Sequence, residues 1–186
     1  MLESRMVKLS VYYFLKDKLD DGDWGSTGYA NNELVTLKDA YPTDEELDRI
    51  VLPENYTGDS NEIVLPVVAI DSGYQNEYPY ELGSGPGTAR QFIISIFGRE
   101  RGETDDLSQQ IYEWFRDNNI SLNNYNEGFP PTVTPTQVGT IEVDRVSLVP
   151  INIYDSPNVA DKHRRDVSFL ATTYISAGSE ETFATS

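Results

Sequence analysis

The chain has 186 residues and no cysteine, so it is long enough for one domain with its own core and excludes disulfides, zinc-thiolate sites and a thiol nucleophile. Its 31 acidic and 14 basic residues give a formal net charge of -17, which opposes binding of nucleic acid over the whole surface, because phosphate affinity depends on Lys and Arg. No stretch resembles a signal peptide or a membrane span, so we expect a soluble protein made in a cytoplasm.

The first segment fits two patterns. Leu2, Met6, Leu9 and Tyr13 form a helical stripe, while the apolar residues between Val7 and Leu15 also alternate as they would in a strand. We predict a helix, because the stretch is long for one strand and ends at the breaker 20–23.

The next part, about residues 17–60, is an acidic insert. Between Asp17 and Glu62 there are 13 acidic residues and three basic ones, which predicts mostly surface. Residues 43–46 have the capping-box pattern, so we expect one short helix with Leu47, Ile50 and Val51 on its apolar face, ending before Pro53.

Residues 62–70 read as a strand, and Pro66 places it at a sheet edge or a bulge. The connection 71–89 is long enough for a projecting β-hairpin arm or a functional loop.

Arg90–Phe97 is rich in aromatic and β-branched residues and predicts a central, largely buried strand. After a turn at 98–102, Thr104 is the expected N-cap of a helix. The buried face of that helix is predicted to carry Leu107, Ile111, Trp114 and Phe115.

The remaining elements are strands and loops. We expect a short strand at 120–125, a loop at 126–131, and a strand at 140–151 whose alternation slips near Arg145, as at a β-bulge. The cleanest alternation is at 167–176, and 177–186 form a polar tail. The order predicts one α+β domain over 1–176, with a mixed or antiparallel sheet of at least four strands, helices packed on one face and a long β-hairpin arm.

The motifs that would indicate catalysis or the binding of a metal or a phosphate are weak. The acidic run from Asp17 lacks the ligand spacing of a calcium loop, and the glycine-rich 83–87 precedes a strand, unlike a phosphate-binding loop. His163, the one histidine, could be oriented by Asp161 or Asp166, but no nucleophile-elbow pattern accompanies it. We therefore predict no catalytic residues, no metal and no cofactor, although a pair of carboxylates remains an alternative.

The loop before the last strand stands out by its charge. Lys162, His163, Arg164 and Arg165 place three of the 14 Lys and Arg residues within four positions. They are either a solvated loop that balances neighbouring charge or a contact patch for an acidic face of another subunit or partner.

The order of elements over about 60–176 resembles the tail-terminator, or tail-completion, proteins of tailed bacteriophages. The residues that carry the resemblance are 65–70, the loop to 80–83, the strand and turn 92–98, the helix after it, and the polar loop with His163, Arg164 and Arg165 before the last strand. The acidic insert departs from the compact pattern and leaves another neck protein as an alternative.

The resemblance implies a structural virion protein that assembles in the host cytoplasm, with no enzymatic activity. It implies a homohexameric ring that caps the tail tube, ends its polymerisation and joins the tail to the head connector. DNA then passes through the lumen without specific binding, and no membrane is involved. The expected interface residues, from the basic loop and the arm, are Lys162, His163, Arg164, Arg165, Tyr80, Leu82 and Arg90.

Overall fold

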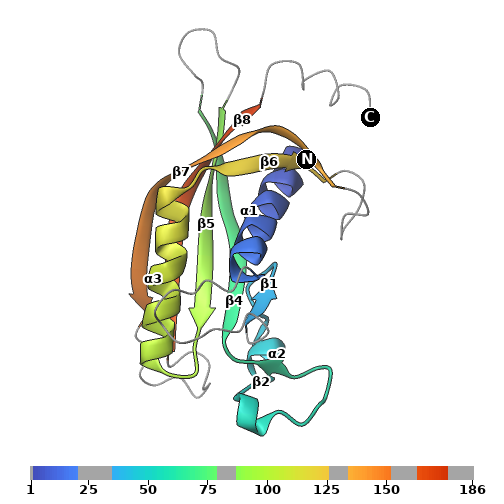
Figure 1. The fold of residues 1–186 in the computed structure, drawn as a ribbon, viewed down its shortest axis with the longest axis vertical. Helices are drawn as coiled ribbons and strands as arrows, with labels where there is room; N and C mark the ends of the chain where they lie inside the picture. The colour runs from blue at the N-terminus through green and yellow to red at the C-terminus, as the bar shows by residue number, and fades with distance from the viewer. Residues whose placement is uncertain (1, 21–34, 79–86, 126–133, 152–162, 176–186) are drawn as a thin grey trace.

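The computed structural model describes residues 2–20, 35–78, 87–125, 134–151 and 163–175 (Figure 1). Its helices and strands follow in the order α1 (Leu2–Asp20), β1 (Thr36–Lys38), α2 (Asp44–Leu47), β2 (Ile50–Val51), the 3-10 turn η3 (Pro53–Asn55), β3 (Ile63–Val64), β4 (Val67–Tyr78), β5 (Gly87–Phe97), α3 (Arg101–Asp117), β6 (Ile120–Asn124), β7 (Thr136–Ile151) and β8 (Arg164–Ile175).

Six of the strands form one mixed sheet in the order β1-β4-β5-β8-β7-β6. β1 pairs in parallel with β4, and all other neighbours are antiparallel. β5 therefore lies inside the sheet between β4 and β8, which confirms the predicted central strand. The α+β fold with at least four strands is confirmed as well.

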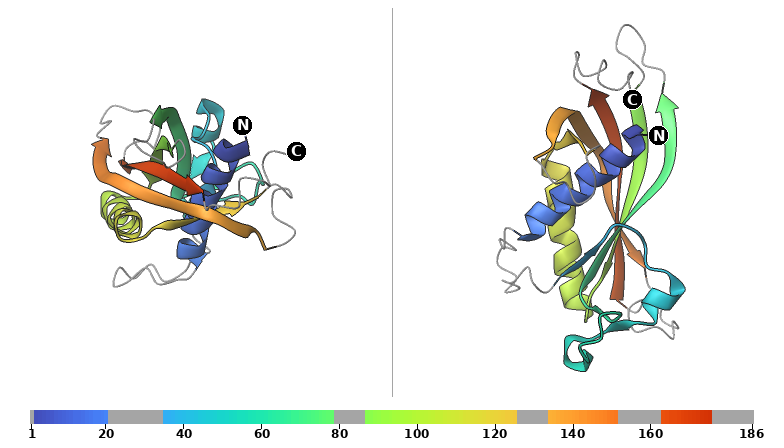
Figure 2. Two further views of the ribbon diagram at one scale, coloured as in Figure 1. Left: turned by 90° about the horizontal axis from the view of Figure 1, so that it is seen from above. Right: turned by 90° about the vertical axis from the view of Figure 1, so that its right-hand side faces the viewer.

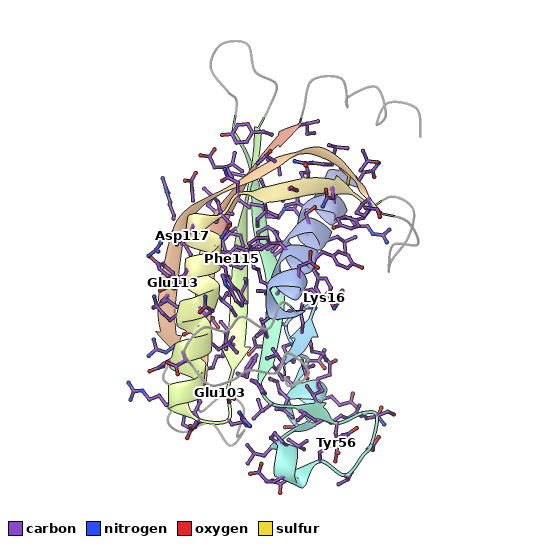
Figure 3. The ribbon with its side chains drawn as sticks, in the orientation of Figure 1. Lys16, Tyr56, Glu103, Glu113, Phe115 and Asp117 are labelled. Atoms are coloured by element: carbon purple, nitrogen blue, oxygen red, sulfur yellow. The ribbon has the colours of Figure 1, made fainter. Side chains whose placement is uncertain are left out.

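The two long helices, α1 and α3, cover the same face of this sheet (Figure 2). Phe169 stacks between Phe92 and Phe115, with ring centroids 5.3 Å and 4.4 Å away. Phe115 points from α3 towards the sheet, while Glu113 and Asp117 lie on the outer side of the helix (Figure 3). Full burial of one such side chain stabilises the fold by about 1.5–3 kcal/mol, so this stack is a main anchor of α3.

The first segment is a helix, as predicted, and it is buried on more than one side. Val11 and Leu15 are fully buried in the core of the sheet. On another side, the hydroxyl of Ser10 accepts a hydrogen bond from the backbone N–H of Asn123 in the edge strand β6, at 3.0 Å. α1 therefore covers an edge of the sheet as well as its face, which explains why strand-like and helical apolar patterns overlap there.

The acidic insert forms a small unit around β2 and β3. The capping box is present: Thr43 accepts from the backbone N–H of Glu46, and Glu46 accepts from that of Thr43. The prediction that Ile50 and Val51 continue the helix was wrong, because α2 ends at Leu47 and both residues form β2. Strand pairing with β3 buries Ile50 beside Leu47, against the face of β4 and β5 opposite the long helices.

Two further details correct the sequence prediction. Thr104 is not the N-cap: α3 begins at Arg101, so Thr104 lies in the first turn, where it is buried. The Glu103 carboxylate accepts a hydrogen bond from the backbone N–H of Arg99, just before the helix, at 2.6 Å. Pro66 marks neither an edge nor a bulge. A cis peptide bond precedes it, and it separates β3 and β4, which belong to different sheets.

The predicted bulge near Arg145 is confirmed. Arg145 has φ 54°, and the register between β7 and β8 shifts between Asp144 and Ser147. A bulge of this kind increases local twist, and here it lies in the strand that pairs with β8 on one side and β6 on the other. β8 alternates as predicted, with Val167, Phe169 and Ala171 buried.

The long connection is a β-hairpin. β4 and β5 pair from Val67 opposite Phe97 to Tyr78 opposite Gly87, and the described strands extend towards the end of the molecule opposite α2 (Figure 1). The predicted loop 126–131, the tail 177–186 and the tip of the arm lie outside the described residues.

Candidate assembly surfaces

The described part of the basic loop lies where β8 begins, beside the start of α3. His163, Arg164 and Arg165 are all partly exposed, whereas Lys162, Tyr80 and Leu82 lie outside the described residues. Successive side chains of a strand point to opposite faces of the sheet, and the two arginines follow this rule.

Arg164 is held within the chain on the face of the sheet that carries the insert. Its guanidinium makes two hydrogen bonds to Asp166, at 3.0 and 2.9 Å, and one to the hydroxyl of Tyr41 at 2.7 Å. The same group lies over the ring of Tyr41, 4.8 Å from its centroid, and 5.8 Å from that of Phe97. With side chains only 17% and 10% exposed, Arg164 and Asp166 fasten the insert to β8.

Arg165 points to the other face and forms an ion pair with Asp105 in the first turn of α3. Asp105 also lies 3.9 Å from the guanidinium of Arg101, and the neighbouring Glu103 pairs with Arg99. These ion pairs neutralise the basic residues near the start of α3. The geometry therefore favours the first interpretation of this loop, a segment that balances neighbouring charge.

His163 contributes its backbone to this junction. Its carbonyl oxygen accepts from the Thr104 hydroxyl at 2.8 Å and from the Gly98 N–H at 3.5 Å. Asp166, one of the two aspartates that could orient the His163 ring, is instead held by Arg164, and Asp161 lies outside the described residues.

Arg90 lies on β5, on the same side of the strand as Phe92 and therefore on the face that the long helices cover. Its exposed fraction is 6%, so in the single chain it is a residue of the interior.

The shifted pKa values have local causes. The hydrogen bond from Lys38, together with that from the Thr43 N–H, lowers the pKa of Glu46 to about 2. Burial raises the pKa of Tyr13 and of Tyr125, whose rings stack at a centroid distance of 5.1 Å. A carboxylate held by a cation stays ionised, which suits an ion pair better than a general acid.

No group of three or more His, Cys, Asp or Glu side chains within the described residues could hold a metal ion. Among the same residues, no helix is long and apolar enough to cross a membrane.

Two charged surfaces were missed by the sequence analysis. The first, which we call the basic stripe, consists of Arg5, Lys8, Tyr12 and Lys16 on α1. Their spacings of three, four and four residues are the signal that could have revealed it, since such residues share one side of a helix. Lys16 lies on α1 on the side away from α3 (Figure 3).

The second, which we call the acidic sheet face, lies on the side of the sheet that the long helices leave uncovered. It carries the exposed carboxylates of Asp71, Glu142 and Asp144, with the partly exposed Ile93 and Leu170 between them. Recognising it required the register of β4, β5, β8 and β7, which joins residues far apart in the sequence.

No protein-family model matches this chain, and no curated protein sequence matches it significantly.

Proposed function

We propose that this protein is a structural virion protein that forms a ring on the end of a bacteriophage tail tube. The ring ends polymerisation of the tube and joins the tail to the head connector. Tail-tube protein, a neck protein of the head and further copies of this chain are its partners.

The observation that carries the proposal is the order and arrangement of elements from β4 to β8. A strand leads through a long hairpin to the central strand β5, then to a helix on one face and to strands that return to pair beside β5. This order of elements is the feature on which the resemblance to tail-terminator proteins rests. The hairpin extends towards one end of the sheet, where it could reach a neighbouring subunit (Figure 1).

The charge of the chain also supports a ring through which DNA passes. Each subunit carries a formal net charge of -17, so a ring of several copies has a strongly negative field. Such a field repels phosphates and keeps DNA from adhering to the lumen.

The acidic insert favours one alternative, another adaptor of the neck. It forms its own small sheet at the end of the molecule away from the hairpin, where it could contact a different component. A carboxylate-based hydrolase is the other alternative that the sequence leaves open.

The test is the mass of the purified protein in solution, measured by light scattering alone and after mixing with the tail-tube protein of the same virus. We expect a discrete species of about six subunits, formed alone or only with the tube, since tube ends raise the local concentration of subunits. A protein that stays monomeric and ignores tubes, but binds isolated head connectors, would favour the neck adaptor. Turnover in a substrate screen would favour the hydrolase.

A further inference from the structure

The net charge sets a condition on any contact between two copies of this chain. Two subunits that each carry -17 repel one another, so a stable contact has to bring locally opposite charges together. The basic loop meets this condition poorly, because Arg164 and Arg165 are paired with carboxylates of their own chain.

The basic stripe is better suited to bring opposite charges of two copies together. The stripe carries the three bases Arg5, Lys8 and Lys16, and α1 as a whole has four basic residues against the three acidic residues Glu3, Asp17 and Asp20. Arg5 is exposed, and the other residues of the stripe are partly exposed. Lys16 has an interaction within its own chain, so the test below relies on Arg5 and Lys8. Among the described bases outside α1, those engaged in ion pairs within the chain are Lys38, Arg49, Arg99, Arg101, Arg116, Arg164 and Arg165.

The acidic sheet face offers the complementary charge from two strands, β4 and β7, which β5 and β8 separate in the sheet. Asp71 lies opposite Ile93, and Asp144 lies opposite Leu170. Beside them the hydroxyls of Ser147 and Ser168 hydrogen-bond at 2.8 Å across the exposed surface. The one base in this part of β7 is Arg145 in the bulge, so carboxylates outnumber bases here.

We propose that the acidic sheet face of one copy packs against the basic stripe of the next. This inference rests on the proposed ring, and it names the two surfaces that join the subunits. The surfaces lie on opposite sides of the sheet, because α1 covers the other face (Figure 2). A contact between two unlike surfaces repeats in one direction, as a closed ring requires, and it buries the partly exposed Ile93, Leu170 and Tyr12.

The absence of cysteine allows a direct test by cross-linking. Arg5→Cys and Asp144→Cys are made as separate variants and treated with a short bismaleimide, under the conditions in which the wild type assembles. We expect linked dimers when the two variants are mixed and none when either is treated alone. Arg49→Cys mixed with Asp144→Cys is the position control and should not link.

Charge reversal gives an independent readout. Arg5→Glu with Lys8→Glu should raise the midpoint concentration of assembly at least about tenfold, because like charges then face each other. Glu142→Lys with Asp144→Lys should do the same, and an equimolar mixture of the two double variants should assemble again. Arg49→Glu with Arg116→Glu changes the net charge by the same amount outside both surfaces and should leave the midpoint within about twofold.

The outcomes separate this inference from the proposed function. If the wild type assembles and both reversals assemble equally well, or if Arg5→Cys links to itself, the inferred pairing is overturned while the ring stands. If Asp144→Cys links to tail-tube protein instead of a second copy, the acidic sheet face binds the tube and the pairing is again overturned. A wild type that never assembles, with or without tubes, contradicts the proposed function itself.

Discussion

Arg164 and Arg165 are neighbours in sequence with the same charge, yet the structure predicts that their removal has very different effects. Arg164→Ala leaves the Asp166 carboxylate, 10% exposed, without its two hydrogen bonds, and also removes the contact with Tyr41. Arg165→Ala removes an ion pair whose acidic partner, Asp105, is 40% exposed.

The magnitudes follow from burial. Breaking a fully buried ion pair by removing one partner costs about 3–5 kcal/mol, and the remaining exposure here reduces this, so we expect about 3 kcal/mol for Arg164→Ala. A solvent-exposed pair contributes about 0–1 kcal/mol, which sets the expectation for Arg165→Ala. For a chain of this size the first change lowers Tm by roughly 6–12 °C and the second by no more than about 4 °C.

Urea denaturation followed by circular dichroism measures both free energies of unfolding. A double-mutant cycle with Asp166→Ala should give a coupling energy of about 1–3 kcal/mol with Arg164→Ala and near zero with Arg165→Ala. Equal destabilisation by the two arginine variants would refute the assignment of Arg164 as the residue that fastens the insert. Loss of assembly in an Arg164 variant is therefore informative only if its fold is intact.

Three further predictions concern packing and pH. Gly98→Ala should cost about 2–3 kcal/mol in urea denaturation, because its Cβ would lie 2.2 Å from the Thr104 hydroxyl, and Thr104→Ala in the same chain should recover part of this. Gly139→Ala should cost at least as much, with no single substitution restoring it, because its Cβ would lie 2.1 Å from a backbone carbonyl. The pKa of Glu46 is depressed to about 2, so its contribution to stability is complete above pH 4.5 and is lost as pH falls towards 2; in an NMR titration Lys38→Met should raise this pKa, and an unchanged value would contradict the assigned cause.

Features encoded by neighbouring residues were predictable. The capping box at Thr43, the buried face of α3 and the bulge at Arg145 each depend on a few consecutive positions, and all are confirmed. The error at Thr104 has the same local origin. Its residue type favours an N-cap, but the N-cap is Glu100. Thr104 lies one turn into the helix, where its hydroxyl donates a hydrogen bond to the carbonyl oxygen of His163.

Features that depend on pairing across the chain were not predictable. Arg164 reaches Tyr41 across 123 positions, and Asn123 reaches Ser10 across 113. Periodicity within one strand shows which side chains share a face and so restricts the register, but it does not show which strands pair, because that depends on the free energy of the whole sheet. For this reason the sequence alone indicated a basic patch at 162–165 but could not show which carboxylates lie beside Arg164 and Arg165.

The pairing of buried carboxylates with arginine side chains bears on the hydrolase alternative. A general acid needs a carboxyl group whose pKa is raised towards neutrality, usually by burial or by a second carboxylate. Each of the two buried carboxylates among the described residues is hydrogen-bonded to a guanidinium: Glu103 to Arg99, and Asp166 to Arg164. Charge-assisted hydrogen bonds of this kind suit these groups to hold elements together. The exposed carboxylates of the acidic sheet face lie on the strands of a sheet, where a partner subunit fits better than a small substrate, and this favours assembly over catalysis.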